Sequence, residues 1–510
     1  MADWSFYGRD VPLAELRKIL GSARWFFCRI SGRRRIGKTT LLRELARGDE
    51  GLSERLLYLQ VPDSDERDVA TSFRRQMEES EFAGAAERAA DVTDFLTMAK
   101  AIGWACRVGM VVVLDEFQYF TRAKMTSFNS FLQAEVDALR NENLKKGGLF
   151  VLGSLQSEMN ALLDDKGAPL YGRITNKLEL EHWDFEDLLD VFSSQGLNAP
   201  SQWLTLWTFF EGVPKFYHDA YVQGLYEVGP ERFSEELLAR MFMSSSSPLS
   251  EEADTWFLRE LRGKGVSVLH YLSEHPGCSH GELMGALKDP HEPSGLTTAV
   301  ARLVNSYMMV DKLLPVFADS TSRSARYYVA DNFLQAWLAV AKPARETARL
   351  RPVERALSLA MPRLQTLEGH MFEKLIRKLH VECSQKGVGN LELSSMNLGY
   401  WNRARNVDQA VEIDLVALDE TNKTIRFGSC KRNEHSHDGA SLSMFDKHIE
   451  GFLSAREFRH LRDWKQERFL FSPMFEEGNR KVLEAKGLTC QDLNDFARVL
   501  TGKAECEHVS

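Results

Sequence analysis

Cysteine is scarce in this chain, and its spacing does not indicate disulfide bonds that would stabilise the fold. Seven cysteines are scattered along 510 residues, their number is odd, and none forms a C-x-x-C pair. This usage argues against a disulfide framework and a zinc site, and it favours a reducing compartment. Long apolar runs are missing as well: none approaches the ~18–20 residues that span a bilayer. The opening MADWSFYGRD also lacks the apolar core of a signal peptide. We therefore expect a soluble, cytoplasmic protein with no membrane partner.

The chain also lacks an excess of positive charge. Its formal net charge is −9 at pH 7, with both signs mixed along the sequence. An acidic balance argues against a protein that coats nucleic acid by bulk charge, but it leaves room for a local basic face. Hydrophobic residues make up 44% and aromatic residues 10% of the chain, which is enough to bury real cores. The length predicts about three or four domains.

One glycine-bearing loop fits the template G-x-x-x-x-G-K-[ST]. Residues 25–30 are apolar and β-prone, and leucines at helical spacing follow the loop, so the context is strand–loop–helix. Glycines let backbone N–H groups close on phosphate oxygens, Lys38 can reach the β- and γ-phosphates, and Thr39 can ligate Mg²⁺. The alternative is a chance match in an ordinary βα turn. The residues that we expect to contact the nucleotide are Gly32, Arg33, Arg34, Arg35, Ile36, Gly37, Lys38, Thr39 and Thr40.

A second apolar run, residues 109–114, ends in two carboxylates, Asp115 and Glu116. A continuous apolar run is typical of a strand buried on both faces, and its C-terminal end lies beside the phosphate site in such sheets. We expect Asp115 to hold the Mg²⁺ shell and Glu116 to orient and deprotonate the attacking water. The alternative is an acidic strand end that faces solvent.

Two further residues are candidates for the catalytic site. Ser154 follows a third predicted strand, where it could hydrogen-bond the γ-phosphate or the water, or simply cap the next helix. Arg173, in PLYGRI, could act as an arginine finger on its own or a neighbouring subunit. The latter would imply a homo-oligomer. A surface or structural arginine is the alternative of equal weight.

Six segments together carry a family resemblance. They occur in one order: FYGRDVPLAELRKIL (6–20), GRRRIGKTTLL (32–42), VVVLDEFQYF (111–120), VLGS (151–154), APLYGRI (168–174) and EGVPKFY (211–217). This order resembles the archaeal-type P-loop ATPases of the AAA+-related signal-transduction class, which also occur in bacteria. The resemblance covers residues 1–340 and continues less strongly to about 475. It implies that Gly212-Val213-Pro214 lies in a nucleotide-sensing helical lid, that a winged helix follows, and that a domain resembling PD-(D/E)xK nucleases comes last.

The middle of the chain fits this order. Residues 181–255 have helical periodicity, and residues 264–330 predict three helices and then two strands around a polar loop, which is the order of a winged helix-turn-helix. The predicted third helix offers few side chains to DNA, and a DNA reader usually shows more lysine and arginine. A protein-docking role therefore stays open beside DNA binding. The candidate DNA contacts are Thr297, Thr298, Arg302, Arg323 and Arg326.

The C-terminal region holds the most ambiguous chemistry. A predicted helix contains Glu373, and two predicted strands, residues 410–419 and 423–432, carry Asp414 and Lys431 at positions that match the nuclease pattern implied by the resemblance. Ser429 occupies the position where this pattern has a glutamate, and a hydroxyl is a poor replacement for a carboxylate as a ligand of a divalent cation. Glu412 lies on the same predicted strand face as Asp414, and with Glu373 as a third oxygen donor it could form a rearranged metal site.

Three readings of this region stay open: an active nuclease, a degenerate fold that binds nucleic acid or a partner, and a purely structural domain. His435 and His437 follow the second strand as metal ligands or as part of a polar loop. Trp401 is more typical of packing than of base stacking.

The predicted fold is multidomain. It has an α/β P-loop NTPase core (1–180), a helical lid (181–255), a winged helix (256–345) and a C-terminal α/β restriction-endonuclease-like domain (346–510). We expect an ATP- and Mg²⁺-dependent ATPase that acts as a switch on double-stranded DNA or a protein client. An ATP-gated DNA nuclease and a non-catalytic nucleotide-binding regulator are the alternatives.

Overall fold

The computed structural model describes residues 3–244, 246–256, 261, 263–287, 293–319, 322–396, 399–403 and 409–502. The chain divides into two compact units. The N-terminal unit comprises Ser5–Trp183 and Val213–Lys215, and the C-terminal unit comprises Met1–Trp4, Asp184–Gly212 and Phe216–Ser510. Each unit is described by itself. The finer division of the C-terminal unit into lid, winged helix and nuclease-like domain stays a prediction.

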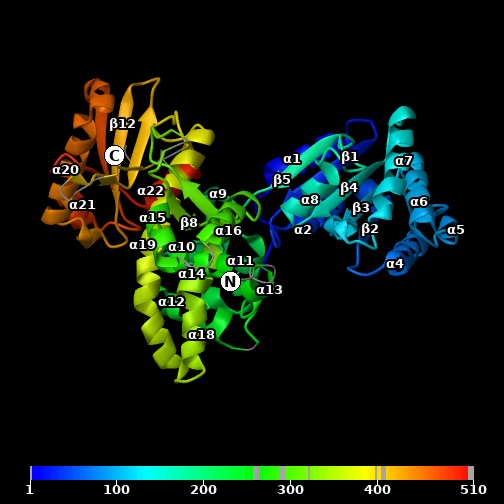
Figure 1. The fold of residues 1–510 in the computed structure, drawn as a ribbon, viewed down its shortest axis with the longest axis horizontal. Helices are drawn as coiled ribbons and strands as arrows, with labels where there is room; N and C mark the ends of the chain where they lie inside the picture. The colour runs from blue at the N-terminus through cyan, green and yellow to red at the C-terminus, as the bar shows by residue number, and fades with distance from the viewer. Residues whose placement is uncertain are drawn as a thin grey trace, which may run out of the picture. The chain divides into compact units, whose positions relative to one another are not determined.

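The N-terminal unit is built on a five-stranded parallel sheet of order β2-β3-β4-β1-β5 (Figure 1). Its strands are β1 (Phe26–Gly32), β2 (Leu56–Gln60), β3 (Val111–Asp115), β4 (Gly148–Gly153) and β5 (Asn176–Leu180). Its helices are α1 (Asp10–Leu20), α2 (Lys38–Arg47), α3 (Glu50–Glu54), α4 (Glu66–Glu78), α5 (Ala85–Ala89), α6 (Phe95–Val108), α7 (Ser127–Asn141) and α8 (Gln156–Leu163).

Two hydrophobic cores sandwich this sheet because successive strand residues point to opposite faces. On β1, Phe27 joins the core under α4, α6 and α7, whereas Phe26 and Cys28 join the core under α1 and α2. Such a strand reads as a continuous apolar run, which is how β1, β3 and β4 could be predicted from the sequence. The carboxyl ends of β1, β3 and β4 meet at one edge, where the site residues lie.

The C-terminal unit starts with a helical region followed by a small helix–sheet region. The first helices are α9 (Phe185–Ser194), α10 (Pro200–Phe210), α11 (Pro214–Val222), α12 (Pro230–Leu238) and α13 (Glu252–Trp256). Next come α14 (Lys264–Glu274), β6 (Cys278–Ser279), α15 (His280–Leu287), α16 (Pro293–Asn305), β7 (Val310–Leu313) and β8 (Arg326–Val329). The three strands form an antiparallel sheet of order β6-β8-β7. The predicted order of three helices and a hairpin is therefore present.

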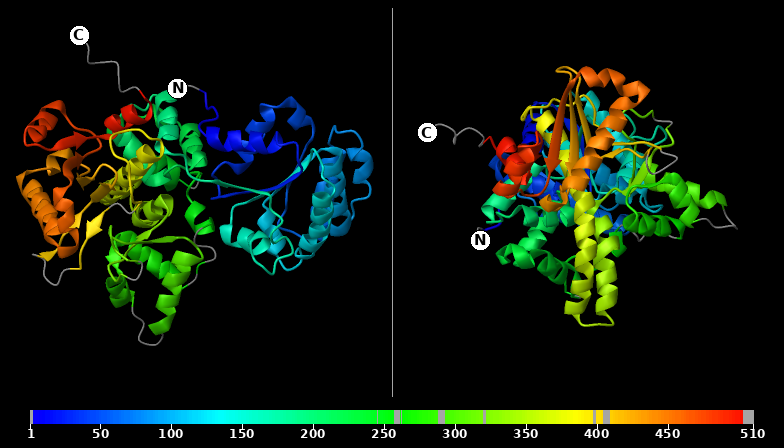
Figure 2. Two further views of the ribbon diagram at one scale, coloured as in Figure 1. Left: turned by 90° about the horizontal axis from the view of Figure 1, so that it is seen from above. Right: turned by 90° about the vertical axis from the view of Figure 1, so that its left-hand side faces the viewer.

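The last part of this unit packs a long helix on a mixed sheet. After α17 (Asn332–Ala336) and α18 (Lys342–Ala348), α19 (Val353–Gln385) runs beside α18 (Figures 1 and 2). The sheet has the order β11-β12-β13-β14, with β11 antiparallel to β12 and the other pairs parallel. Its strands are β11 (Leu415–Asp419), β12 (Thr424–Cys430), β13 (Lys465–Phe471) and β14 (Thr489–Gln491). The remaining helices are α20 (Gly439–Ser454), α21 (Glu477–Glu484) and α22 (Leu493–Leu500).

One strand prediction was wrong. Residues 410–419 are not one strand: β10 (Glu412–Ile413) pairs with β9 (Tyr400–Trp401), and β11 starts after Asp414. The carboxylate of Asp414 accepts a hydrogen bond from the backbone N–H of Cys430 at 2.8 Å, which holds the break between the two strands. Glu412 consequently belongs to a different sheet from β11.

Candidate functional site

The predicted phosphate loop lies between β1 and α2. Its last residue before the helix, Gly37, has φ 93°, and Gly32 at the end of β1 has φ 146°. A Cβ at position 32 would come within 2.5 Å of the Leu180 carbonyl oxygen on the neighbouring β5. Both positions thus require glycine for backbone reasons. Arg9 supports the loop from α1's N-terminal end, since its guanidinium donates to the carbonyl oxygens of Ile36 and Glu181.

Lys38 is held inside this loop. Its Nζ donates to the carbonyl oxygens of Gly32 at 2.9 Å and Arg33 at 3.1 Å, and only 8% of the residue is exposed. Burial lowers the pKa of Lys38 to about 8, while Asp115 and Glu116 act in the opposite direction. The ammonium is thus close to both predicted carboxylates and inside a cradle of loop backbone.

Asp115 and Thr39 meet directly. Thr39 Oγ1 donates to Asp115 Oδ2 at 2.6 Å, and Tyr58 Oη donates to the same oxygen at 2.6 Å. Burial raises the pKa of Tyr58, and its hydrogen bond to Asp115 raises it further. A hydroxyl and a carboxylate in contact at the end of a phosphate loop are the oxygen ligands that Mg²⁺ takes beside a nucleotide. The donor set fits this cation.

Sequence reasoning missed Tyr58. It lies on β2, whose residues pair in parallel with β3 so that Gln60 faces Asp115. No strand was predicted there, because LLYLQ is short and carries no motif. The signal that could have indicated this residue is a tyrosine inside a short apolar run, the first such run after the helix that follows the phosphate loop.

Glu116 has a strained backbone and a restrained side chain. Its φ is 56°, in the left-handed region, where a non-glycine residue needs support from its surroundings. Gln118 Nε2 donates to Glu116 Oε2, and Ser154 Oγ lies 3.4 Å from the same oxygen. Gln118, 2% exposed, also escaped sequence analysis. These contacts fix the carboxylate next to Asp115, whose Oδ1 accepts the Glu116 N–H.

The structure separates the roles considered for Ser154 and Arg173. The N-cap of α8 is Leu155, so Ser154 does not cap this helix and instead lies beside Glu116. Arg173 forms a two-bond ion pair with Asp137 of α7, with both N–O distances 2.8 Å. Its role as a finger stays a prediction.

A second cluster in the C-terminal unit brings together Glu373 of α19, Asp414 and Lys431. Burial raises the pKa of Glu373, and the charge of Asp414 raises it further. Burial also raises the pKa of Asp414, and the ammonium of Lys431 opposes this. The three predicted residues therefore feel one another's charge. Ser429 is buried on β12.

Glu412, however, does not contribute to that cluster as a free ligand. Its carboxylate forms an ion pair with Arg326 of β8, at 2.5 and 3.1 Å. The Arg326 guanidinium lies 4.7 Å from the Trp401 ring centre, and Trp401 Nε1 donates to the Ser324 carbonyl at 2.7 Å. Arg326 and Trp401 thus join the hairpin to β9 by packing. Of the other predicted DNA contacts, Thr297, Thr298 and Arg302 lie on α16 and Arg323 lies in the hairpin.

The two histidines after β12 differ in environment. His437 is buried, its Nε2 lies 3.1 Å from the Phe471 carbonyl oxygen, and burial lowers its pKa to about 4. His435 is exposed and lies near Glu434 and Glu476. Glu434 accepts hydrogen bonds from the Glu476 N–H and from Asn479, which is a structural use of this carboxylate.

Comparisons with known proteins found similar domains in two parts of the chain. A family model described as an AAA domain matches residues 27–189, and one described as "Archaea bacterial proteins of unknown function" matches residues 337–442. An uncharacterized protein of Methanocaldococcus jannaschii is 23% identical over 437 residues, which cover 84% of this chain and 87% of that protein.

Two solved structures are similar at low identity. The Walker-type ATPase of Pyrococcus abyssi is 15% identical, has a TM-score of 0.49, and covers 66% of this chain and 96% of its own. The ORC2 protein of Aeropyrum pernix is 14% identical, has a TM-score of 0.44, and covers 70% of this chain and 93% of its own.

Within the part of the chain that the structure describes, no helix combines the length and the apolar composition of a membrane span.

Three observations on the N-terminal unit point to the same kind of domain. They are the parallel sheet, the phosphate loop with its adjacent carboxylates, and the match of residues 27–189 to the AAA model. Residues 27–189 are therefore similar to AAA domains, and their fold is that of a P-loop NTPase core.

Proposed function

We propose that this protein is a Mg²⁺-dependent ATPase that uses the bound nucleotide to switch its C-terminal unit. The contact between Thr39 Oγ1 and Asp115 Oδ2, beside a restrained Glu116, carries the proposal. A protein that only holds a nucleotide needs the loop and the cation ligands. Turnover further needs a base next to them, and Glu116 supplies it.

In this proposal the phosphate loop, the cation ligands and the side chains around them have distinct roles. The backbone N–H groups of Gly32–Thr40 and the N-terminus of α2 bind the phosphates, and Lys38 pairs with their β- and γ-oxygens. Thr39 and Asp115 hold Mg²⁺, which neutralises charge on the phosphates when bound. Glu116 accepts a proton from the attacking water, Ser154 orients that carboxylate, and Arg173 stabilises charge on the γ-phosphate from its own or a neighbouring subunit.

A buried carboxylate with two lysine partners supports the coupling to the C-terminal unit. Glu211 immediately precedes Gly212-Val213-Pro214, the predicted nucleotide sensor, and its carboxylate is 7% exposed. Its Oε1 binds Lys378 at 2.9 Å and lies 3.6 Å from Lys374, both on α19. Lys374 also donates to the Ala330 carbonyl and to Asn332 Oδ1. A shift of Glu211 therefore acts on α19 and on the end of the hairpin region together.

The same stretch of α19 carries the second cluster. Along α19, Glu373 is followed by Lys374, and Arg377 by Lys378. The first residue of each pair lies on the side of Asp414, and the second lies on the side of Glu211. We infer that the region from α14 to β8 is a winged helix and that the sheet after α19 is a degenerate PD-(D/E)xK fold. The client is double-stranded DNA or a protein partner, and a homo-oligomer follows if Arg173 acts in trans.

An ATP-gated nuclease is the second candidate, because Glu373, Asp414 and Lys431 interact electrostatically. Ser429 in place of a carboxylate counts against it. The non-catalytic regulator is the third candidate, and Glu116 beside Asp115 counts against it.

The test is ATP hydrolysis by the purified chain with and without double-stranded DNA, beside Glu116→Gln and Lys38→Ala. DNA integrity is scored in the same tubes, with Asp414→Asn as the control for cutting. We expect turnover that falls at least 100-fold in Glu116→Gln while ATP binding persists, and loss of both in Lys38→Ala. Equal turnover in wild type and Glu116→Gln would rule out the proposed chemistry. Cutting that Asp414→Asn abolishes would establish the nuclease instead.

A further inference from the structure

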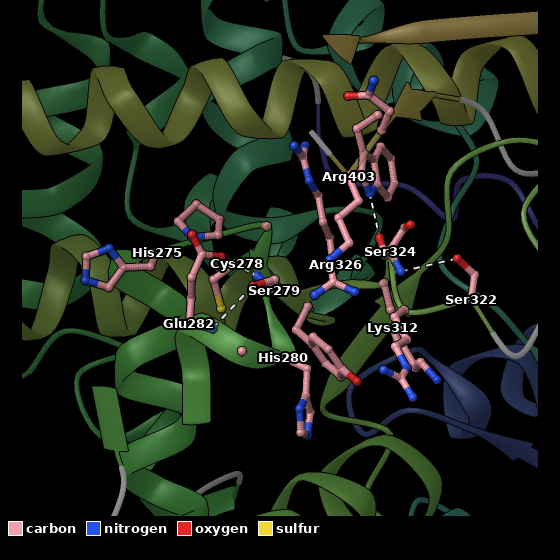
Figure 3. A pocket seen from close by; sticks show the side chains of 18 of the residues that line it. His275, Cys278, Ser279, His280, Glu282, Lys312, Ser322, Ser324, Arg326 and Arg403 are labelled. Carbon is pink, nitrogen blue, oxygen red and sulfur yellow. Dashed lines mark hydrogen bonds between the residues drawn. The ribbon is translucent and has the colours of Figure 1, made fainter. Parts of the chain in front are cut away.

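A pocket of about 920 Å³ opens in the C-terminal unit, where Arg326, the ion-pair partner of Glu412, is part of its lining. Three pieces of chain line it: the turn into α15, the β7–β8 hairpin, and the segment that leaves β9. In Figure 3, Ser279 and Glu282 lie toward one side of this space, while Lys312, Arg326 and Arg403 lie toward the other. Its lining is rich in cations: Lys312, Arg323, Arg326 and Arg403.

These cations are poorly neutralised. Arg326 is paired with Glu412, and the only carboxylate that lines the pocket is Glu282. In the part of the chain that the structure describes, no ion pair is formed by Lys312, Arg323 or Arg403. Three cations therefore face one carboxylate in a protein whose overall net charge is −9.

The first turn of α15 is not what makes this a site. Ser279 and Glu282 already form a reciprocal cap, with the Ser279 N–H on Glu282 at 2.7 Å and the Glu282 N–H on Ser279 at 3.2 Å. The ligand-binding groups are instead the arginines and the lysine on the hairpin and after β9. Arg326 is fixed on Trp401 and Glu412, so it anchors the wall between them.

We propose that this pocket binds the phosphate backbone of a nucleic-acid strand. Arginine and lysine from separate strands match a ligand with several phosphates in a row, and the volume exceeds that needed for one mononucleotide. The contact then falls on the hairpin and β9, rather than on the exposed face of α16. This inference rests on the nucleic-acid branch of the proposed function, but it does not depend on ATP hydrolysis.

The experiment measures anisotropy of a fluorescein-labelled 20-base-pair duplex and its single strand, without nucleotide, across a salt series. Arg323→Ala, Arg403→Ala and Lys312→Ala each remove one pocket cation. Arg302→Ala tests the competing surface, since Arg302 is the exposed arginine of α16 that the sequence predicted as a DNA contact, and it lies outside the pocket lining. Arg363→Ala, at an exposed position on α19, is the matched control and should bind as wild type does. Arg326 is left intact because its loss would leave Glu412 without this ion-pair partner.

We expect each pocket variant to weaken binding at least fivefold at 0.1 M salt. Each should also lower the slope of log affinity against log salt by about 0.9 for the duplex or about 0.7 for the strand, as one lost phosphate contact requires. Arg302→Ala should bind as wild type does.

Three results would overturn the assignment. They are unchanged binding in all pocket variants, selective loss in Arg302→Ala, and displacement of the oligonucleotide by micromolar pyrophosphate, which would indicate a small polyphosphate ligand. Because no nucleotide is added, a pocket that fails this test leaves the ATPase proposal standing. An inactive ATPase that still binds DNA through the pocket would show the reverse.

Discussion

Tyr58 Oη and Thr39 Oγ1 both donate to one carboxylate oxygen of Asp115, each at 2.6 Å. One of these donors belongs to the phosphate loop and the other to the neighbouring strand β2. Thr39 can exchange its hydrogen bond for a cation, but Tyr58 cannot, since a neutral phenol is a poor ligand for Mg²⁺. Tyr58 therefore positions Asp115 for the cation without taking its place.

Tyr58→Phe should lower kcat about tenfold, because a hydrogen bond to a charged group contributes ~1.5–3 kcal/mol and each ~1.4 kcal/mol is a factor of ten. The Mg²⁺ concentration for half-maximal turnover should rise, while ATP affinity without the metal stays within twofold. Tyr119→Phe, in the segment after Glu116, is the control and should match wild type. An unchanged Mg²⁺ dependence in Tyr58→Phe would mean that the phenol is only structural.

How much of this site the sequence could predict depends on the kind of signal. The loop, Asp115 and Glu116 were predictable because strand–loop–helix context and a spacing rule fix their places. Tyr58 and Gln118 were not, since their roles come from strand order and from a 3₁₀ turn that no local pattern encodes. The sheet order β2-β3-β4-β1-β5 is a tertiary result of how the helices cover both faces.

In the C-terminal unit, periodicity located the elements but not their pairing. Alternation in residues 410–419 predicted one strand, yet Asp414 bonds the Cys430 N–H and divides it. Arg326 was predicted to contact DNA because an arginine in a predicted hairpin is expected to be exposed. Its actual partners, Glu412 and Trp401, are about 80 residues away and could not be inferred from local pattern.

Arg173 and Asp137 offer a direct test of the finger. If Arg173 acts on the γ-phosphate, Arg173→Ala should reduce turnover at least 100-fold, since such arginines contribute 10³–10⁵ in rate. Asp137→Asn should leave turnover within about fivefold, because it frees the guanidinium without removing it. Steady-state hydrolysis of both variants, with thermal unfolding as a control for folding, decides between the roles. Equal losses in the two variants would assign Arg173 to holding α7.

Glu211→Gln should uncouple nucleotide binding from α19. Neutralising this buried carboxylate weakens its link to the partly exposed Lys374 and Lys378 and leaves two ammonium groups facing a neutral amide. In wild type we expect ATP to change hydrogen exchange in the middle of α19, and in the variant we expect this change to be lost while ATP still binds. Glu186→Gln is the matched control, because Glu186 pairs with Lys386 of α19 from a half-exposed position. Persistence of the ATP effect in Glu211→Gln would disprove this route of coupling.

His380 should make the C-terminal sheet sensitive to acid. Its Nδ1 lies 2.9 Å from the Ile376 carbonyl oxygen and its Nε2 lies 3.5 Å from the buried Arg426. Burial, with a smaller effect of Arg426, lowers its pKa to about 3. The unfolded histidine, with its ordinary pKa near 6.5, therefore takes up a proton that the folded one refuses. Stability should be full above pH 6.5 and decline as the pH falls toward 3.

By pH 5 this loss should reach about 2 kcal/mol, from ~1.36 kcal/mol per pH unit below 6.5. Hydrogen exchange of the β12 amides at pH 7.5 and 5, corrected for the intrinsic rate, measures it. His380→Gln keeps a hydrogen-bonding side chain without a titrating group, so its protection should change less between the two values. His435→Gln, at an exposed position, should behave as wild type. A pH dependence that survives in His380→Gln would place the acid sensitivity in another group.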